Sequence, residues 1–151
     1  MFGEKAKQLV YIGSDHAGVK IKEQLHKHLL DAGCSATDLG TFTEESCDYP
    51  DIAREVGEKV KEHKGSFGIL ICGTGIGMSM AANRMRGIRA AMVTDENMAE
   101  MSRKHNNANV LCMGAKISTQ ELMNKMTDKF LATPFDAEER HARRVQKMDE
   151  I

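Results

Sequence analysis

The stretch GILICGTGIGMSMAANR, from Gly68 to Arg84, decides the fold of this chain. It begins with an apolar run that ends at Cys72, passes through glycines at positions 73, 75 and 77, and enters a segment of helix-forming residues. The pattern is typical of a strand, a glycine-rich turn and a helix. Because such a turn directs backbone N–H groups and a helix N-terminus above the strand end, the sequence predicts an anion site beside Cys72.

Units of the same kind flank this stretch on both sides. Ile21, Leu25 and Leu29 recur at helical spacing on a segment that ends at Gly33, with Lys22 and other polar residues mostly off that face. The expected strands lie at residues 9–13, 34–39, 69–72, 88–93 and 110–113. The remaining helices are expected after the glycine-rich turn and at 51–63, 95–104, 120–131 and 137–150.

Short apolar strands that alternate with helices indicate a parallel sheet covered on both faces. We therefore predict a Rossmann-like three-layer α/β/α sandwich, a single domain over residues 1–151, with a five-stranded parallel sheet and an extra C-terminal helix. The common strand order 2-1-3-4-5 places the ends of the first and third strands side by side. In that order, Asp15-His16 and Cys72-Gly73 converge at one crevice, where we expect ligand and chemistry.

Composition excludes several classes of protein. The formal net charge is -1, and the chain has no Trp and only 2 Tyr, which argues against a nucleic-acid-binding surface. No apolar run approaches the length of a membrane span, and the N-terminal residues MFGEKAKQ lack the apolar core of a signal peptide. We expect a cytoplasmic protein with no membrane or nucleic-acid partner.

Four cysteines are scattered through the chain, at positions 34, 47, 72 and 112, without the spacing of a zinc site. We expect four free thiols and no metal. Cys72 alone adjoins the glycine-rich turn, whose donors favour a thiolate that can act as nucleophile or base. The alternative is a small buried side chain at a strand end.

Other polar residues also have two interpretations. Asp15 and His16 follow the first strand, where Asp15 is either a helix cap or part of the site. His105 enters the polar run HNNAN, either as a helix-terminal histidine or as a functional one. His26, His28 and His63 are interpreted as exposed. GTGIG is a weak match to a nucleotide loop, because its third glycine comes too early and no GK[ST] follows, so its donors could serve a developing oxyanion instead.

The last helix is heavily charged and has few residues to bury. It is either a solvated terminal helix or a phosphate-binding element, since Arg140 and Arg144 lie four residues apart on one face.

Six collinear motifs resemble ribose-5-phosphate isomerase type B, in the family shared with the galactose-6-phosphate isomerase subunits. They are SDHAG (14–18), DYPD (48–51), GILICGTGIGMSMAANR (68–84), GIRAA (87–91), RKHNNANVL (103–111) and RHARRV (140–145). The resemblance implies a cofactor-free interconversion of ribose 5-phosphate and ribulose 5-phosphate through an enediolate, a step of the pentose phosphate pathway. It also implies a homodimer, or a dimer of dimers, in which the C-terminal helix reaches into the partner's site.

The resemblance implies a role for each matching residue. Cys72 would move the proton between carbons 1 and 2 with help from Thr74, and His105 would open the furanose ring. The implied substrate-binding residues are Asp15 on the sugar hydroxyls; Gly73, Gly75 and Gly77 on the enediolate oxygen; His16, Arg140 and Arg144 on the phosphate; and Tyr49 and Asn106 along the pocket.

Three positions depart from the family pattern. Met78 stands where one branch has a glutamate base, which leaves that role to Cys72. Glu138-Glu139 replaces a common Gly-Gly before the Arg-His pair. Lys116 replaces an arginine that often reaches the phosphate, so the charge stays while the bidentate fork is lost. The alternatives are an allose-6-phosphate or galactose-6-phosphate isomerase, and a nucleotide-binding regulatory module.

Overall fold

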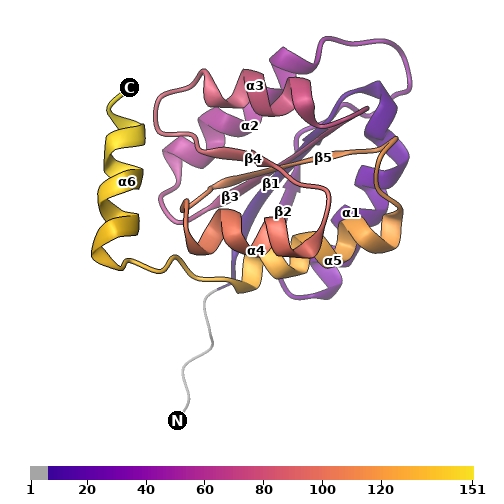
Figure 1. Cartoon of the computed structure of the whole chain (residues 1–151). Coiled ribbons are helices and arrows are strands. Elements are labelled where there is room, and N and C mark those ends of the chain that lie inside the picture. Colours follow the sequence, from indigo (N-terminus) through magenta and orange to yellow (C-terminus); the bar gives the residue numbers. More distant parts are fainter. Residues whose placement is uncertain (1–6) are drawn as a thin grey trace.

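The computed structural model describes residues 7–151 (Figure 1). The expectation about the N-terminal segment therefore concerns residues that lie mostly outside the described part. The strands are β1 (Leu9–Ser14), β2 (Ser35–Asp38), β3 (Phe67–Cys72), β4 (Ala90–Met92) and β5 (Val110–Gly114). The helices are the 3-10 turn η1 (His16–Gly18), α1 (Val19–Asp31), α2 (Tyr49–Glu62), α3 (Ile76–Asn83), α4 (Glu96–Lys104), α5 (Gln120–Ala132) and α6 (Glu139–Asp149).

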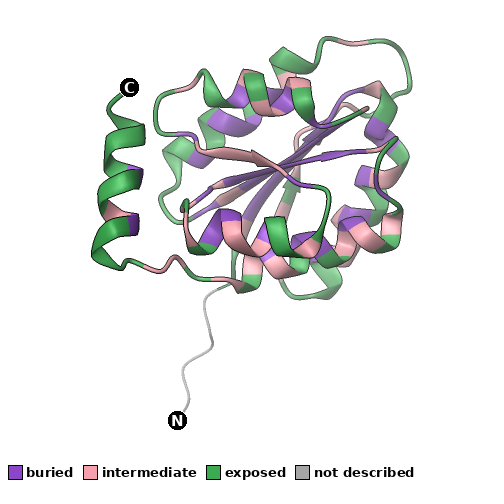
Figure 2. Ribbon diagram, in the orientation of Figure 1, coloured by how far each residue is buried: buried purple, intermediate pink, exposed green. Residues whose placement is uncertain are grey.

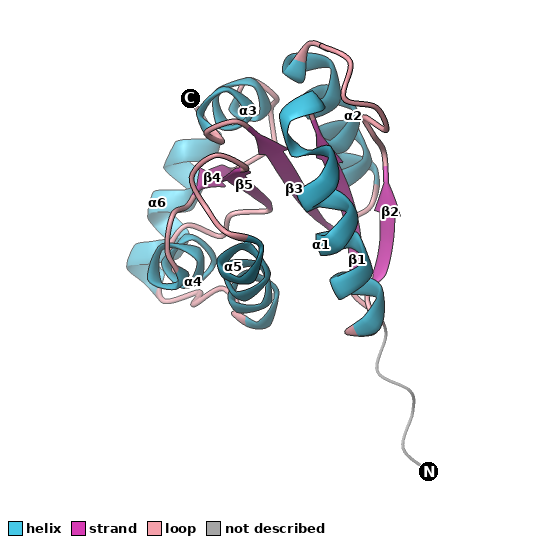
Figure 3. Ribbon diagram, turned by 90° about the vertical axis from the view of Figure 1, so that its right-hand side faces the viewer, coloured by secondary structure: helices cyan, strands magenta, loops and turns pink. Residues whose placement is uncertain are grey.

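The predicted three-layer α/β/α sandwich is confirmed. All strand pairs are parallel, and the sheet lies between two layers of helices (Figure 3). Helices α1, α4 and α5 cover one face, and α2 and α3 cover the other. The strand interiors are buried and the outer helix faces are exposed (Figure 2), as expected for a sheet that is covered on both sides.

The predicted strand order 2-1-3-4-5 is wrong at its end. The observed order is β2-β1-β3-β5-β4, so β5 lies beside β3 and β4 forms the edge. All five residues of β5 are buried, whereas the three residues of β4 are only partly buried. The longer apolar strand occupies the interior because it gains more from burial on both faces. The predicted contact between β1 and β3 is confirmed.

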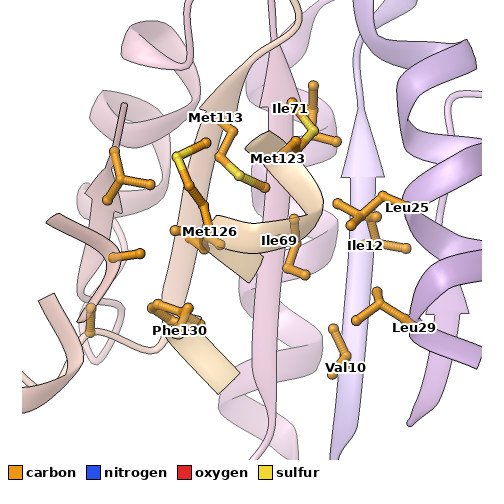
Figure 4. Close-up of a cluster of buried hydrophobic side chains, with 14 residues drawn as sticks. Val10, Ile12, Leu25, Leu29, Ile69, Ile71, Met113, Met123, Met126 and Phe130 are labelled. Atoms are coloured by element: carbon orange, nitrogen blue, oxygen red, sulfur yellow. The ribbon is translucent and has the colours of Figure 1, made fainter. Parts of the chain in front are cut away.

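Alternate side chains of β3 face opposite layers. Ile69 and Ile71 join the core under α1, α4 and α5 (Figure 4), where Met123, Met126 and Phe130 also pack. Leu70 and Cys72 face the core under α2 and α3. The period of two therefore places the Cys72 side chain on the α2–α3 side of the sheet, at the end where the strand stops.

Three polar side chains lie deeper than the sequence predicts. Lys22 is fully buried and pairs with Asp38, although its spacing places it off the apolar face of α1. His26 and His28 are partly buried because they contact the Ala36 carbonyl and the Asp128 carboxylate, respectively. Only His63 of the three histidines expected on the surface is exposed.

Helix α6 stands outside the sandwich. It lies on the opposite side of the sheet from the loop between β5 and α5 (Figure 1), and its surface is largely exposed (Figure 2). Only His141 and Val145 of this helix are buried. Among residues 7–151, no helix is long and apolar enough to cross a membrane.

Candidate functional site

Cys72 ends β3 at the carboxyl edge of the sheet and is 5% exposed. The backbone N–H of Gly75 donates to its Sγ over 3.1 Å. This bond ties the sulfur to the glycine-rich turn that the sequence places beside it.

The glycine-rich turn is pressed against the end of β5. Gly75 has a φ of 84°, and a Cβ on it would lie 2.9 Å from the Met113 carbonyl carbon. A Cβ on Gly114 would lie 2.7 Å from the backbone of Thr74. The Thr74 hydroxyl accepts a hydrogen bond from the Ile76 N–H over 3.2 Å. The conformation of the turn is thus fixed both by its close packing against β5 and by hydrogen bonds within the turn.

Asp15 and His16 lie at the same edge as Cys72. The Asp15 N–H donates to the Ile71 carbonyl over 3.0 Å, and its carboxylate caps η1 by accepting from the Ala17 N–H. Asp15 is therefore a helix cap, and it also lies at the sheet edge where the site is predicted. His16 accepts a hydrogen bond from the Cys47 N–H at Nδ1 over 3.2 Å. A neutral ring that accepts at Nδ1 carries its proton on Nε2, which leaves a donor for a ligand.

Two further predicted residues lie on the turn. A Cβ on Gly77 would meet the Tyr49 ring at 2.7 Å, so this aromatic side chain packs directly on the first turn of α3. The Lys116 side chain lies over Gly73, 3.6 Å from the place of a Cβ, and the Lys116 N–H donates to the Gly73 carbonyl. An ammonium group therefore lies beside the backbone donors that adjoin Cys72.

The other thiol on this face of the sheet is a different case. Cys112 is completely buried in β5, and burial raises the pKa of its thiol, with nearby Cys72 adding to the shift. Cys112 therefore stays neutral and acts as a packing residue.

His105 and Asn106 lie at the amino edge of the sheet, away from Cys72. They follow α4 and precede β5, whose first residue Val110 pairs with Gly68, whereas its last residue pairs with Cys72. The four steps from Val110 to Gly114 separate the two edges by about 13 Å at the usual rise per residue. Within one chain, the structure does not bring His105 or Asn106 to Cys72.

Helix α6 belongs with His105. The rings of His105 and His141 stack with centroids 4.4 Å apart and planes 10° apart. Arg140 is exposed and pairs with Glu138 over 3.3 Å, and Arg144 is also exposed. A groove of about 610 Å³, lined in part by Asn106, separates the end of α6 from the body of the protein.

The predicted residues thus form two groups. We call them the Cys72 group, at the carboxyl edge, and the His105 group, at the amino edge. The Cys72 group comprises Asp15, His16, Tyr49, Cys72, Gly73, Thr74, Gly75, Gly77 and Lys116. The His105 group comprises His105, Asn106, Arg140 and Arg144.

Sequence reasoning missed two residues that support these groups. Lys22 is buried with Asp38 beneath the loop that contacts His16. Arg103 donates to the carbonyls of Ala108 and Thr133 and so braces the turn after His105 against the segment that leads to α6. Burial lowers the pKa of the Arg103 guanidinium, with Arg89 adding to the effect. The sequence gives no signal for the pairing of Lys22 with Asp38 or of Arg103 with Thr133, because these partners are 16 and 30 residues apart.

One cluster has donor atoms that suit a cation. Asp136, Glu138 and His141 place one potential ligand atom each within 4.8 Å of one another, and no other group of this kind occurs in the described part of the chain. The sequence predicts no metal, and two of these side chains already make other contacts: Glu138 with Arg140, and His141 with His105.

Comparison with known proteins identifies relatives over nearly the whole chain. The sequence model of the family described as Ribose/Galactose Isomerase matches residues 10–148. The ribose-5-phosphate isomerase B of Escherichia coli K12 is 37% identical over 142 residues, covering 94% of this chain and 95% of the relative. The ribose-5-P isomerase B of Listeria innocua is 39% identical over 142 residues, with the same coverage.

Solved structures of proteins named ribose 5-phosphate isomerase are also similar to this chain. A crystal structure of a ribose 5-phosphate isomerase from Thermotoga maritima superposes with a TM-score of 0.93 at 46% identity, covering 97% of this chain and 100% of that one. The ribose-5-phosphate isomerase B of Mycoplasma genitalium, solved with bound ribulose-5-phosphate, gives a TM-score of 0.91 at 39% identity, covering 97% of both chains.

Proposed function

The chain belongs to the ribose/galactose isomerase family, and on that basis we propose that it interconverts D-ribose 5-phosphate and D-ribulose 5-phosphate. The observation that carries the proposal is the thiol of Cys72, which accepts a backbone N–H and lies at the same sheet edge as Asp15 and His16. This arrangement supports assigning the base to Cys72, beside groups that can bind a sugar and an anion.

In the proposed reaction, the Cys72 thiolate removes the proton from carbon 2 of the open-chain aldose and returns it to carbon 1. The electron pair of the broken C–H bond forms the carbon–carbon double bond of an enediolate, and the aldehyde oxygen takes up the negative charge. The hydroxyl proton moves from oxygen 2 to oxygen 1, a transfer that Thr74 assists. No electron enters or leaves, so the product is the ketose with the same atoms.

Backbone donors of the turn would hold the enediolate oxygen. Gly75 already donates to the thiol, whereas the Gly77 N–H lies in the first turn of α3 and has no acceptor within the helix. The Gly73 N–H completes the set in this proposal. Donors aimed at a developing oxyanion are commonly worth about 3–4 kcal/mol each. Met78, where a glutamate base stands in one branch of the family, is fully buried, which supports assigning the base to Cys72.

The substrate phosphate and the ring-opening step need the His105 group as well. We propose a homodimer in which α6, His105 and Asn106 of one protomer complete the Cys72 group of its partner. The distance between the two groups within one chain supports this arrangement, as do the exposed apolar side chains of Ile76 and Met80 on α3. The chain then acts as one isomerase domain, residues 1–151, with α6 docked on the partner.

In this dimer, His105 opens the furanose ring by proton transfer. The phosphate is held by His16 from one protomer and by Arg140 and Arg144 from the other, with Lys116 as an additional point charge. The ion pair between Glu138 and Arg140 competes with the phosphate, and it exists because a glutamate occupies a common glycine position. We further propose a cytoplasmic location, which suits the four free cysteines.

The test is a coupled assay of the purified protein on ribose 5-phosphate, in buffer with a chelator. We expect formation of ribulose 5-phosphate without added metal. Allose 6-phosphate and galactose 6-phosphate are the comparison substrates, and faster turnover of either would reassign the sugar. Binding of a nucleotide without any isomerisation would replace the enzyme proposal with a regulatory one.

A further inference from the structure

Lys22 of α1 is the one lysine from residue 7 onward that is fully buried, and the reaction proposed above does not use it. Its Nζ lies 2.6 Å from both carboxylate oxygens of Asp38, which is itself 13% exposed. Withdrawing two charges from water is costly, and an apolar pair of similar volume often stabilises a fold as well. The pair therefore calls for a reason beyond stability.

The contacts of Asp38 lead into the loop between β2 and α2, residues 39–48. Its Oδ1 accepts the Gly40 N–H over 2.8 Å, in addition to the Lys22 ammonium. The Phe42 ring covers the ammonium with its centroid 4.8 Å from Nζ, a cation–π contact. The ion pair thus fixes the start of the loop through the Gly40 N–H and the Phe42 ring.

The same loop is attached at two points to the segment 14–16, which carries Asp15 and His16 of the Cys72 group. The Gly40 carbonyl accepts from the Ser14 N–H, and the Thr41 N–H donates to the Ser14 carbonyl, both over 2.7 Å. Further along, the Cys47 N–H donates to His16 Nδ1. The loop therefore runs from the ion pair to the ring nitrogen that sets the tautomer of His16.

We propose that Lys22 is a positioning residue: through Asp38 it fixes the 39–48 loop so that the Cys47 N–H holds His16 with its Nε2–H directed to the substrate phosphate. The phosphate assignment rests on the proposed function; the effect on the His16 ring does not. A residue that orients a ligand-binding group affects binding of the group's ligand more than the chemical step.

The principal variant is the double substitution Lys22→Met with Asp38→Asn, which removes both charges and leaves no unpaired carboxylate. Asn keeps an oxygen for the Gly40 N–H. We expect the KM for ribose 5-phosphate to rise by about tenfold or more while kcat stays within about threefold, because the phosphate ligand is displaced and the base is not. Affinity for inorganic phosphate should fall by a similar factor.

Lys22→Arg keeps the positive charge beside Asp38, so its KM should rise less than the KM of the double variant. Lys27→Met is the matched control, because Lys27 lies on the same helix and pairs with Asp31, but 72% of its side chain is exposed. That variant should leave KM, kcat and phosphate affinity unchanged.

A readout independent of activity is the ¹⁵N NMR spectrum of the His16 ring. In the wild type, Nδ1 should appear as a hydrogen-bonded acceptor, and in the double variant its resonance should move toward the average of two tautomers. Phe42→Ala is the substitute if the double variant fails to fold. The Phe42 ring is 66% exposed, so its removal leaves no cavity in the core, but it removes the cation–π contact that helps Lys22 to fix the loop. An intermediate shift of the His16 resonance is expected there.

A folded double variant with an unmoved His16 resonance and unchanged KM would overturn the proposal and reduce Lys22 to a structural residue. An unmoved resonance in Phe42→Ala, where that variant is needed, would do the same. If the wild type does not isomerise ribose 5-phosphate, the proposed function fails, and the NMR comparison still decides whether Lys22 positions His16.

Discussion

The two groups of predicted site residues differ in how firmly the chain holds them. At the carboxyl edge, Cys72, Gly75 and His16 each have a hydrogen-bonded partner, and a Cβ on Gly114 or Gly77 would collide with its neighbour. At the amino edge, α6 buries only His141 and Val145, and Arg140 and Arg144 are exposed. In the proposed mechanism, each chain therefore supplies the proton-transfer half of one site and the phosphate-binding half of another.

Helix α6 is attached to the body of its own chain mainly near its two ends. Its end is tied to the body by an ion pair of 3.2 Å between Arg89 and Asp149, and its start by the Asp136 N–H, which donates to the Lys104 carbonyl. A groove of about 610 Å³ lies beside the helix. Because most helical stability in proteins comes from packing of an apolar face, the small buried surface of α6 is what the proposed docking on a partner would explain.

The largest effect should come from Cys72→Ala. If the thiolate transfers the proton, kcat on ribose 5-phosphate falls by about 10²–10⁴-fold, the usual contribution of a general base. Cys112→Ala is the matched control, since this thiol faces the same layer of the sheet but is completely buried. It should lose stability and keep kcat within a few-fold of wild type. A Cys72→Ala enzyme with near wild-type kcat would remove this residue from the mechanism.

The second prediction tests whether the Cys72 group and the His105 group of one site come from different protomers. Cys72→Ala and Arg140→Ala each damage both sites of a homodimer, but a mixed dimer has one site with both changes and one site with neither. Equal mixing should therefore restore about a quarter of wild-type activity if the site is shared across a two-fold axis. The measurement is activity after co-refolding, with mixed dimers quantified through a tag on one chain. No recovery in confirmed mixed dimers would place Arg140 in the site of its own chain.

The regular elements were predictable because apolar spacing alone distinguishes helices from buried strands here. The order of the last two strands could not be predicted with the same ease, since both are short and apolar. The one available sign that β4 is an edge strand is its two alanines, which follow Arg89. Convergence of Asp15 and Cys72 followed from topology. The position of His105 could also have been inferred, because a helix between parallel strands ends at their amino edge. The pairing of Lys22 with Asp38 could not, as nothing in either segment indicates the other.

A smaller effect should distinguish the two edges by overpacking. Gly114→Ala introduces a Cβ 2.7 Å from the backbone of Thr74, so the glycine-rich turn must shift. We expect a stability loss of about 1–3 kcal/mol and a fall in kcat of about tenfold. Gly68→Ala, at the amino end of β3, has the side chains of Val56, Val60 and Val110 as the nearest neighbours of its Cβ, and no backbone atom is nearer. It should show a similar loss in denaturant unfolding without the fall in kcat; equal effects on kcat would mean that the turn is not specially constrained.

The smallest effect tests whether α6 belongs to the core. Leu25→Ala empties a fully buried position under the sheet and should cost about 2–5 kcal/mol of global stability. Val145→Ala removes a side chain that is 8% exposed and should weaken α6 docking by about 1 kcal/mol, with almost no change in the midpoint of global unfolding. Hydrogen exchange of α6 amides should instead accelerate, and more so at low protein concentration, where a dimer dissociates. A Val145→Ala protein that loses as much global stability as Leu25→Ala, with unchanged α6 exchange, would show that the helix is fixed to its own chain and that the two edges are equally complete.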